Sequence, residues 1–234
     1  MNSINKTARI AGALYLLLLP LGILGLIYVQ SALIVHGDAA TTASNILASE
    51  SLFRFSIVSA LMVQVVNIFV VLTLYQVLKP VNRNMAMLMV IFILLGAPIA
   101  MLSEANRFAV LPLLSNMDYL AVFTADQLQA LAYFFLDLHE NGIQVASIFW
   151  GLWLFPMGYL VYKSGFLPKI LGILLIIGCF GYLVDFFIAA LFPDLNVTVS
   201  QFTFIGELLL PLWLLIKGVN VEQWEKRALE SAQI

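Results

Sequence analysis

Long apolar stretches recur along the chain, and mostly short polar segments separate them. Six of these stretches reach or exceed about 18 residues, the length that indicates a membrane-spanning helix. The pattern therefore predicts an all-α integral membrane protein, built as a bundle of six transmembrane helices. The predicted spans are residues 10–29, 55–78, 85–111, 143–162, 170–192 and 197–216.

The composition agrees with this pattern and limits the partners. Of the 234 residues, 62% are apolar and only 10% are charged, whereas a soluble domain carries about 25% charged residues. We expect a single transmembrane domain at residues 1–221 and a cytoplasmic C-terminal tail at residues 222–234, with the lipid bilayer as partner. The formal net charge of −2 and the lack of a basic patch argue against nucleic-acid binding.

Basic residues gather at one set of helix ends, and this asymmetry predicts the orientation of the chain. The opposite loops offer only Arg54 close to a helix end. By the positive-inside rule, both termini face the cytoplasm (N-in, C-in). The basic residues on the predicted cytoplasmic side are Lys6, Arg9, Lys79, Arg83, Lys163, Lys169, Lys217, Lys226 and Arg227.

The first outer loop, residues 30–54, is long and carries a helix signal of its own. Asp38 could cap a short helix over residues 39–53. Glu50 and Arg54 are one turn apart on it and could form an ion pair. We expect this helix either to lie over the bundle or to extend the second span.

The segment before the fourth span contains Thr124-x-x-Gln127, a capping-box pattern that predicts a helix start. A helix from there to Lys163 would be about 58 Å long, almost twice the hydrocarbon thickness. Asn141-Gly142 is a plausible break inside it. The fourth helix is therefore expected either to be long and continuous or to break at that dipeptide.

Two carboxylates interrupt the last two spans, where a charge costs at least about 2.5 kcal/mol on insertion scales. Glu207 stands ten positions before Lys217, which places it roughly 15 Å deep. Asp185 stands sixteen positions after Lys169, roughly 24 Å from the inner boundary. Tyr182 and several small residues share the helix face of Asp185, which predicts that this face points into the bundle. We expect both acids to face protein or a water-filled cavity.

The second and third spans also carry polar residues. Glu104 and Arg107 are three positions apart on the third span, a spacing that permits an intrahelical ion pair. Their predicted depth is the outer interface, so a pair that snorkels to the surface is the alternative to a buried site. Gln64 and Asn67 lie one turn apart near the middle of the second span, and we expect them to form hydrogen bonds between helices.

The densest polar run on the outer side extends from Asp137 to Asn141. His139 is turned about 200° from Asp137 on a regular helix, so the two cannot bind one metal ion unless the helix breaks. Two histidines and one cysteine cannot make a histidine-rich zinc site, although carboxylates could supplement them. Phosphate-binding loops and hydrolase motifs are absent from the sequence. We therefore expect neither a metal nor a cofactor.

A set of longer motifs extends over nearly the whole chain: Lys6-Thr-Ala-Arg-Ile-Ala-Gly12, Gly37-Asp-Ala-Ala40, Asn45-Ile-Leu-Ala-Ser-Glu50-Ser-Leu-Phe-Arg54, Leu78-Lys-Pro-Val-Asn82, Phe135-Leu-Asp137-Leu-His139, Tyr162-Lys-Ser-Gly-Phe-Leu-Pro168, Gly206-Glu207 and Leu215-Ile-Lys-Gly-Val-Asn220. In these motifs the chain resembles a bacterial family catalogued as domain of unknown function 4386. The resemblance implies a multi-helix protein of the bacterial inner (cytoplasmic) membrane without an assigned activity. It carries over no functional residues.

The acidic residues in and near the spans suggest a function. They outnumber Arg107 by four, or by three if His139 is charged. If most of them face one cavity, a proton or a bound cation must relieve the repulsion between them. The leading hypothesis is therefore a buried site, open to the outside, that binds or translocates a proton, a cation or a small cationic solute. The acids concerned are Glu104, Asp137, Glu140, Asp185 and Glu207.

In this hypothesis Glu207 is the deepest group, Asp185 is its partner, and Glu104 and Asp137 form the mouth. One alternative is an intramembrane metal-assisted lipid hydrolase that uses His139 together with the acids. Another is a non-catalytic sensor or scaffold, in which the acids form structural hydrogen bonds. The sequence favours a protein that is not an enzyme, without deciding the question.

Overall fold

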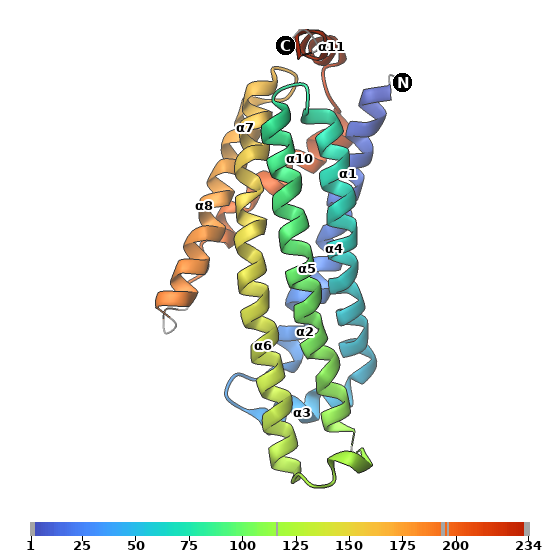
Figure 1. Cartoon of the computed structure of the whole chain (residues 1–234), viewed down its shortest axis with the longest axis vertical. Helices are drawn as coiled ribbons and strands as arrows, with labels where there is room; N and C mark the ends of the chain where they lie inside the picture. The colour runs from blue at the N-terminus through green and yellow to red at the C-terminus, as the bar shows by residue number, and fades with distance from the viewer. Residues whose placement is uncertain (1–2, 116, 193–194, 196, 232–234) are drawn as a thin grey trace. The chain divides into compact units, whose positions relative to one another are not determined.

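The computed structural model describes residues 3–115, 117–192, 195 and 197–231. Every regular element in these residues is a helix (Figure 1). Five helical runs among them are long and apolar enough to cross a membrane, and a bent pair of helices near the C-terminus would add a sixth. The predicted all-α, multi-pass architecture is therefore confirmed.

The helices follow the predicted spans with some extensions and interruptions. In chain order they are α1 (Ser3–Gly22), η1 (Ile23–Tyr28), α2 (Val29–Leu33), α3 (Ala39–Ala48), α4 (Glu50–Leu78), α5 (Arg83–Leu114), η2 (Asp118–Leu120), α6 (Ala125–Leu152), α7 (Leu154–Ser164), α8 (Lys169–Leu191), α9 (Ser200–Thr203), α10 (Ile205–Ile216) and α11 (Val221–Ser231).

The first span is one helical run, Ser3–Leu33, with a widened turn in it. The π-helical turn η1 separates α1 from α2 and follows Pro20, which lies inside α1. Proline has no N–H to donate, and a local π adjustment can satisfy the backbone groups that it frees. Gly25 in η1 approaches α4 closely, since a Cβ there would lie 2.6 Å from the backbone nitrogen of Ala60.

The fourth span continues through Asn141-Gly142 as the helix α6 (Figure 1). Gly142 serves close packing there rather than a turn, because a Cβ at this position would overlap the hydroxyl group of Ser103 on α5. The interruption comes later, at Trp153, between α6 and α7. Pro156 explains its place, because proline cannot donate to the carbonyl group four residues earlier and its ring clashes with that group.

The segments between the first two spans and before the fourth keep the local signals found in the sequence. Asp38 caps α3, and its Oδ1 accepts a hydrogen bond of 2.9 Å from the backbone N–H of Thr41. α3 ends at Ala48 and α4 begins at Glu50, so the outer helix is a separate element. Glu50 and Arg54 form the expected ion pair, at 2.7 Å.

The capping box before α6 is also formed. The N–H of Thr124 donates to the side chain of Gln127, and the N–H of Gln127 donates to the Thr124 hydroxyl oxygen. The start of the fourth helical span is therefore confirmed at the residues that the sequence indicated.

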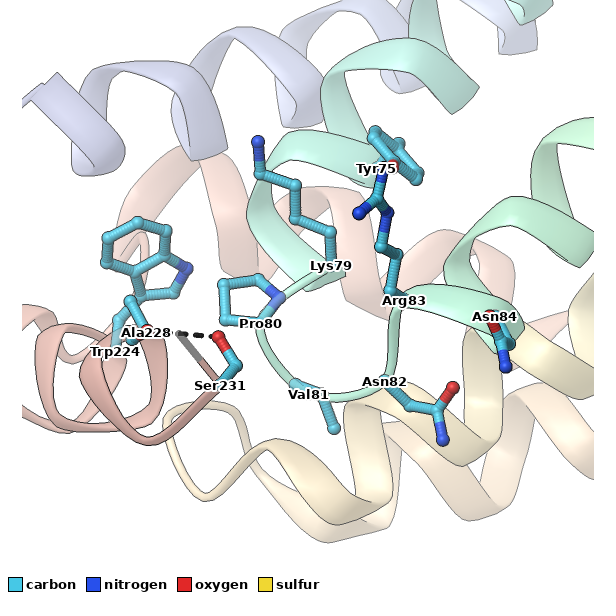
Figure 2. Close-up of a pocket in the computed structure, with 10 residues that line it drawn as sticks. All are labelled: Tyr75, Lys79, Pro80, Val81, Asn82, Arg83, Asn84, Trp224, Ala228 and Ser231. Atoms are coloured by element: carbon cyan, nitrogen blue, oxygen red, sulfur yellow. Dashed lines mark hydrogen bonds between the residues drawn. The ribbon is translucent and has the colours of Figure 1, made fainter. Parts of the chain in front are cut away.

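The last span is shorter than predicted, and a further helix follows it. The span begins at Ser200 and changes at Phe204 from α9 to α10. The helix α11 then turns by 104° from Ser200–Ile216, and its Trp224 indole donates to the carbonyl oxygen of Val77 at 2.8 Å. Figure 2 shows Trp224 beside the turn that carries Pro80. The expected tail at 222–234 is thus helical as far as Ser231, and residues 232–234 lie outside the described residues.

The chain divides into two compact units. Unit 1 comprises Met1–Leu17, Val66–Ala97 and Val145–Ile234, and unit 2 comprises Leu18–Val65 and Pro98–Gln144. In unit 1, α8 packs against α7 and α10. Unit 2 has an apolar core in which Phe53 and Ile57 of α4 join residues of α2, α3, α5 and α6. Each unit carries its own buried polar group.

Candidate functional site

A polar group with a buried centre lies in unit 2, and we call it the Glu104 cluster: Gln30, Ser56, Glu104, Arg107 and His139. Glu104, Arg107 and His139 are each only 1% exposed. The carboxylate oxygen Oε2 of Glu104 accepts from Nη1 of Arg107 at 3.3 Å. Its other oxygen, Oε1, lies 2.8 Å from Nε2 of His139. The carboxylate is therefore held on both oxygens, by a permanent cation and by an imidazole.

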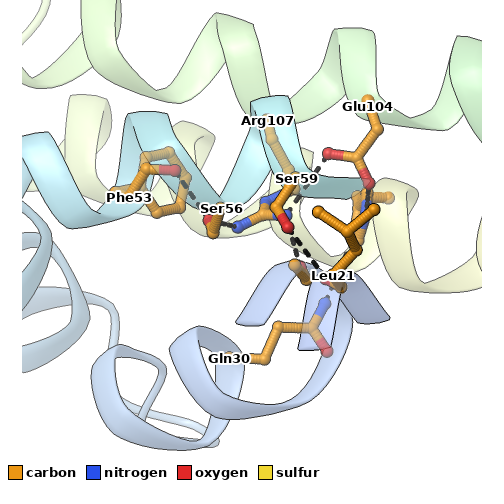
Figure 3. Close-up of polar contacts among 9 residues, drawn as sticks. Leu21, Gln30, Phe53, Ser56, Ser59, Glu104 and Arg107 are labelled. Atoms are coloured by element: carbon orange, nitrogen blue, oxygen red, sulfur yellow. Dashed lines mark hydrogen bonds and ion pairs between the residues drawn. The ribbon is translucent and has the colours of Figure 1, made fainter. Parts of the chain in front are cut away.

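Arg107 is held by several neighbours besides Glu104 (Figure 3). Its Nη1 donates to the carbonyl oxygen of Gly25 at 3.1 Å, and its Nη2 donates to the hydroxyl of Ser56. The Ser56 hydroxyl in turn donates to the carbonyl oxygen of Phe53 at 2.7 Å. The guanidinium also stacks on the Phe53 ring, 5.0 Å from its centroid, a favourable cation–π contact. These contacts position the cation toward Glu104.

Backbone features of three helices bring these groups together. α5 supplies Glu104 and Arg107 one turn apart. The close approach of Gly25 to α4 places its carbonyl group in the widened turn η1, within reach of Arg107. Gly142 lies three residues after His139 on α6 and lets α6 approach α5, so that the imidazole reaches Glu104. Glycine at these two positions is thus a condition for the cluster.

The hydrogen bonds of His139 define a proton position. Nε2 of Gln30 lies 3.3 Å from Nδ1 of His139. If the Gln30 amide donates to Nδ1, the ring proton is on Nε2 and is donated to Glu104. If the amide is turned around, its oxygen can accept from a protonated Nδ1, and the imidazole is then positively charged. The same neighbours can therefore satisfy both charge states of His139.

Unit 1 holds a second acid, Glu207, which is partly buried and lies in a different environment. Its Oε2 accepts from the Tyr15 hydroxyl at 3.1 Å, and Tyr182 brings a second phenol group close to the same carboxyl group. The Oε1 atom is buried and has no hydrogen-bond partner among the described residues. The Tyr15 ring packs against Trp153 at 5.6 Å between centroids. Among the ion pairs of the described residues, none involves Glu207.

Asp185 has a local structural contact. Its Oδ1 accepts from the backbone N–H of Val199 at 2.5 Å, and its Oδ2 accepts from that of Ser200 at 3.0 Å. Both oxygens thus bind the chain where α9 begins, which is why the last span starts at Ser200. Tyr182 lies near enough to both Asp185 and Glu207 for the charge of either acid to act on its hydroxyl group.

The structure does not bring all the predicted site residues together. Asp137 and Glu140 are exposed on α6, whereas His139 between them is buried. This follows from the helix geometry, since α6 is regular at this point. Gln64 and Asn67 are buried, but their side-chain oxygens have no hydrogen-bond partner in the described part of the chain. Because Asp137 and Glu140 are exposed, fewer of the five acids are withdrawn from solvent than the sequence count assumed.

Several of the contacts that build these sites have no clear signal in the sequence. Tyr15 lies inside an apolar stretch, Gln30 directly follows that stretch, and the carbonyl group of Gly25 has no side-chain signal. Ser56 could have been noticed as a polar residue one turn before Ser59 within the second span. Among the described residues, no three His, Cys, Asp or Glu side chains lie close enough to hold a metal ion.

Comparisons with known proteins add a family but no activity. The model of a family described as "Domain of unknown function (DUF4386)" matches residues 10–218, a range that includes the Glu104 cluster and Glu207. An uncharacterized protein of Archaeoglobus fulgidus is 34% identical over 171 residues, which cover 72% of this chain and 87% of the relative. Because this relative is archaeal, the expected restriction to bacteria is too narrow. No solved structure matches the chain.

Proposed function

We propose that this protein, which belongs to the family described as a domain of unknown function (DUF4386), binds and translocates protons. The family carries no assigned activity, so the proposal rests on the geometry of the Glu104 cluster. The observation that carries the proposal is the 2.8 Å contact between His139 and Glu104, both 1% exposed within helices long enough to span a membrane. Histidine is the side chain whose charge changes most readily near neutral pH.

Two hydrogen-bonding arrangements give the cluster two proton states. In the first, neutral His139 donates from Nε2 to Glu104 and accepts from the Gln30 amide at Nδ1. In the second, a proton has bound at Nδ1 and the Gln30 amide has turned, so that its oxygen accepts. Both states leave every ring nitrogen with a partner, so that a proton can bind and leave without exposing an unpaired buried group.

The charge balance favours a proton that is bound only transiently. Arg107 balances Glu104, so the cluster is neutral when His139 is neutral. A bound proton gives the cluster a single positive charge, which is costly in an apolar medium. A group of this kind passes a proton on rather than stores it. A larger cation would have to compete with Arg107 and His139 for the Glu104 oxygens, which is why we favour a proton over a cationic solute.

Glu207 is the second proton-binding group of the proposal. A partly buried carboxyl group with phenol neighbours and no cation can be neutralised by a proton or by a bound cation. The Tyr15 and Tyr182 hydroxyl groups can donate to a carboxylate, and their oxygens can accept from a carboxylic acid, so they are compatible with both states. We place the protein in the cytoplasmic membrane with both termini on the cytoplasmic side, as the basic residues predict.

Proton flux into liposomes tests this proposal. Purified protein is reconstituted with a pH-sensitive dye inside, and a potassium diffusion potential drives proton entry. We expect the wild type to acidify the lumen faster than empty liposomes, and His139→Gln and Glu104→Gln to abolish the excess rate.

The chain offers a matched control in its other histidine, His36, which is exposed in the outer loop. His36→Gln should conduct as the wild type does. A wild type indistinguishable from empty liposomes would contradict the proposal, as would a His139→Gln variant with an unchanged rate. Either result would favour the reading of the cluster as a structural element of a sensor or scaffold.

A further inference from the structure

A cavity of about 780 Å³ opens in unit 1 where α4 ends, α5 begins and α11 crosses them (Figure 2). The turn between α4 and α5 forms its floor, and α11 forms one wall. It belongs to neither buried acidic site. The lining residues are Tyr75, Lys79, Pro80, Val81, Asn82, Arg83, Asn84, Trp224, Ala228 and Ser231.

The helix α11 has the features of a helix that lies in the membrane interface. It is turned by 104° from the preceding span, and five of its eleven residues are charged, so it is unsuited to cross a membrane. Trp224 on its inner face is fixed by the hydrogen bond to Val77, and tryptophan is typical of the interface. These features are those expected of a helix at the depth of lipid headgroups, and the cavity lies against this helix.

The charge of the lining is positive. Among the described lining residues, Lys79 and Arg83 are the two that carry a formal charge at neutral pH, whereas the whole chain carries a net charge of −2. Figure 2 shows both side chains extending to the same side of the turn. The ammonium group of Lys79 lies 6.0 Å from the centre of the Tyr75 ring, a contact that restricts its position. The orientation predicted from the basic residues places this end of unit 1 toward the anionic cytoplasmic leaflet.

We propose that this cavity binds a phosphate group, supplied either by the headgroup of an anionic phospholipid or by a soluble phosphate ester. Lys79 and Arg83 contact the phosphate oxygens, and Arg83 can do so with two N–H groups at once. Asn82 and Asn84 supply further polar contacts on the same turn, and Trp224 and Pro80 cover the apolar part of the bound molecule. The site is independent of the proton proposal, because it shares no residue with the Glu104 cluster or with Glu207.

Two arms of one experiment distinguish the sources of phosphate. In the first, the protein is placed in nanodiscs of phosphatidylcholine with or without phosphatidylglycerol, and amide hydrogen exchange is measured. We expect phosphatidylglycerol to slow exchange at residues 79–84 and in α11. In the second, glycerol 3-phosphate and inorganic phosphate are added to protein in phosphatidylcholine nanodiscs. Because both arms use the wild type, neither depends on the folding of a variant.

A matched pair of double variants then locates the site. Lys79→Gln/Arg83→Gln removes both cations of the cavity, and Lys163→Gln/Lys169→Gln removes two cations of the same predicted side outside it. We expect the first double variant to lower the affinity for the phosphate probe by roughly fivefold for each cation removed, and the second to leave it unchanged.

The outcomes distinguish a lipid headgroup, a soluble phosphate ester and general surface attraction. Protection by phosphatidylglycerol that only the first double variant loses assigns a lipid headgroup to the cavity. Binding of glycerol 3-phosphate with the same dependence, without a lipid preference, assigns a soluble ester. Equal losses in both double variants would show general surface attraction and overturn the proposal, as would no protection by any of the phosphate probes.

Discussion

Glu104 and Glu207 are both carboxyl groups inside apolar helices, yet the protein holds them in opposite ways. Glu104 in unit 2 contacts the cation Arg107 and the imidazole of His139, at 3.3 and 2.8 Å. Glu207 in unit 1 accepts from the neutral phenol of Tyr15. In the proposal above, the imidazole of His139 is the group that changes its proton in unit 2, and the carboxyl group of Glu207 is that group in unit 1. The two units thus surround their acids with different partners: a cation and an imidazole in unit 2, and phenol groups in unit 1.

The largest expected effect separates these two acids directly. Glu104→Gln leaves the buried charge of Arg107 without its partner, and we expect it to lower the free energy of unfolding by about 3–5 kcal/mol. Glu207→Gln keeps the shape of the side chain and an acceptor for Tyr15, so its effect should stay within about 1 kcal/mol. Unfolding in mixed micelles, followed by circular dichroism, measures both.

The exposed pair Glu50–Arg54 is the control for this comparison, since it has similar helical spacing but lies at the surface. Glu50→Gln should change the stability by no more than about 0.5 kcal/mol, because water and salt screen the pair. Equal losses for Glu104 and Glu207 would remove the distinction between the units.

A substitution of Gly142 should disrupt the Glu104 cluster by steric overlap alone. Gly142→Ala adds a methyl group where Ser103 already lies, and we expect a loss of about 1–3 kcal/mol from overpacking. It should also separate His139 from Glu104 and slow proton flux. The double variant Gly142→Ala/Ser103→Gly makes room for the methyl group, so the two changes should be strongly non-additive in a double-mutant cycle. Simple additivity would show that the helices do not meet at this point.

Within unit 1, Asp185 differs from Glu207, because its carboxylate caps the start of α9. Asp185→Asn replaces one of two acceptor oxygens by a donor, so one of the contacts to the N–H groups of Val199 and Ser200 is lost. We expect a destabilisation of about 1–2 kcal/mol and faster amide exchange at these two residues. Unchanged exchange there would show that the carboxylate does not hold the start of α9.

The smallest expected effect concerns Asp38, an acid between the first two candidate spans. The side-chain and backbone hydrogen bonds from Thr41 lower the pKa of Asp38 below its usual value. Because the folded-state pKa is the lower one, the stabilisation of α3 is complete above the usual aspartate range and is lost as the pH falls through the lowered pKa. The protection of the Thr41 amide, corrected for its intrinsic exchange rate, should follow this course. Asp38→Asn should make the protection independent of pH in the acid range.

Much of the fold could be predicted because its causes are local. Span lengths, the Asp38 cap, the capping box at Thr124 and the Glu50–Arg54 pair all depend on residues within one or two helical turns. The continuity of α6 could not be decided in this way. Asn141-Gly142 favours a turn by composition, and only the neighbouring Ser103 on another helix explains why the glycine lies in a continuous helix.

The contacts in the candidate sites were harder to predict than the helices, because they join residues on different helices. The sequence could identify Glu104, Arg107, His139 and Glu207 as polar residues in or near spans, and the angle between Asp137 and His139 indicated that they face apart. It could not pair His139 with Glu104, because that contact depends on the packing of α6 against α5. The π turn that presents the carbonyl group of Gly25 has no signal in hydropathy, since backbone groups are the same in every residue.

The most direct test of the central claim is the proton state of His139 itself. In the His36→Gln background the chain has a single histidine, so isotope-labelled histidine gives one set of imidazole nitrogen signals in a lipid nanodisc. We predict two forms of the ring in exchange: a neutral form that carries its proton on Nε2 and donates it to Glu104, and a form that carries a second proton on Nδ1. Glu104→Gln should change the populations of the two forms. A ring that shows a single tautomer and a single charge in both proteins would contradict the account.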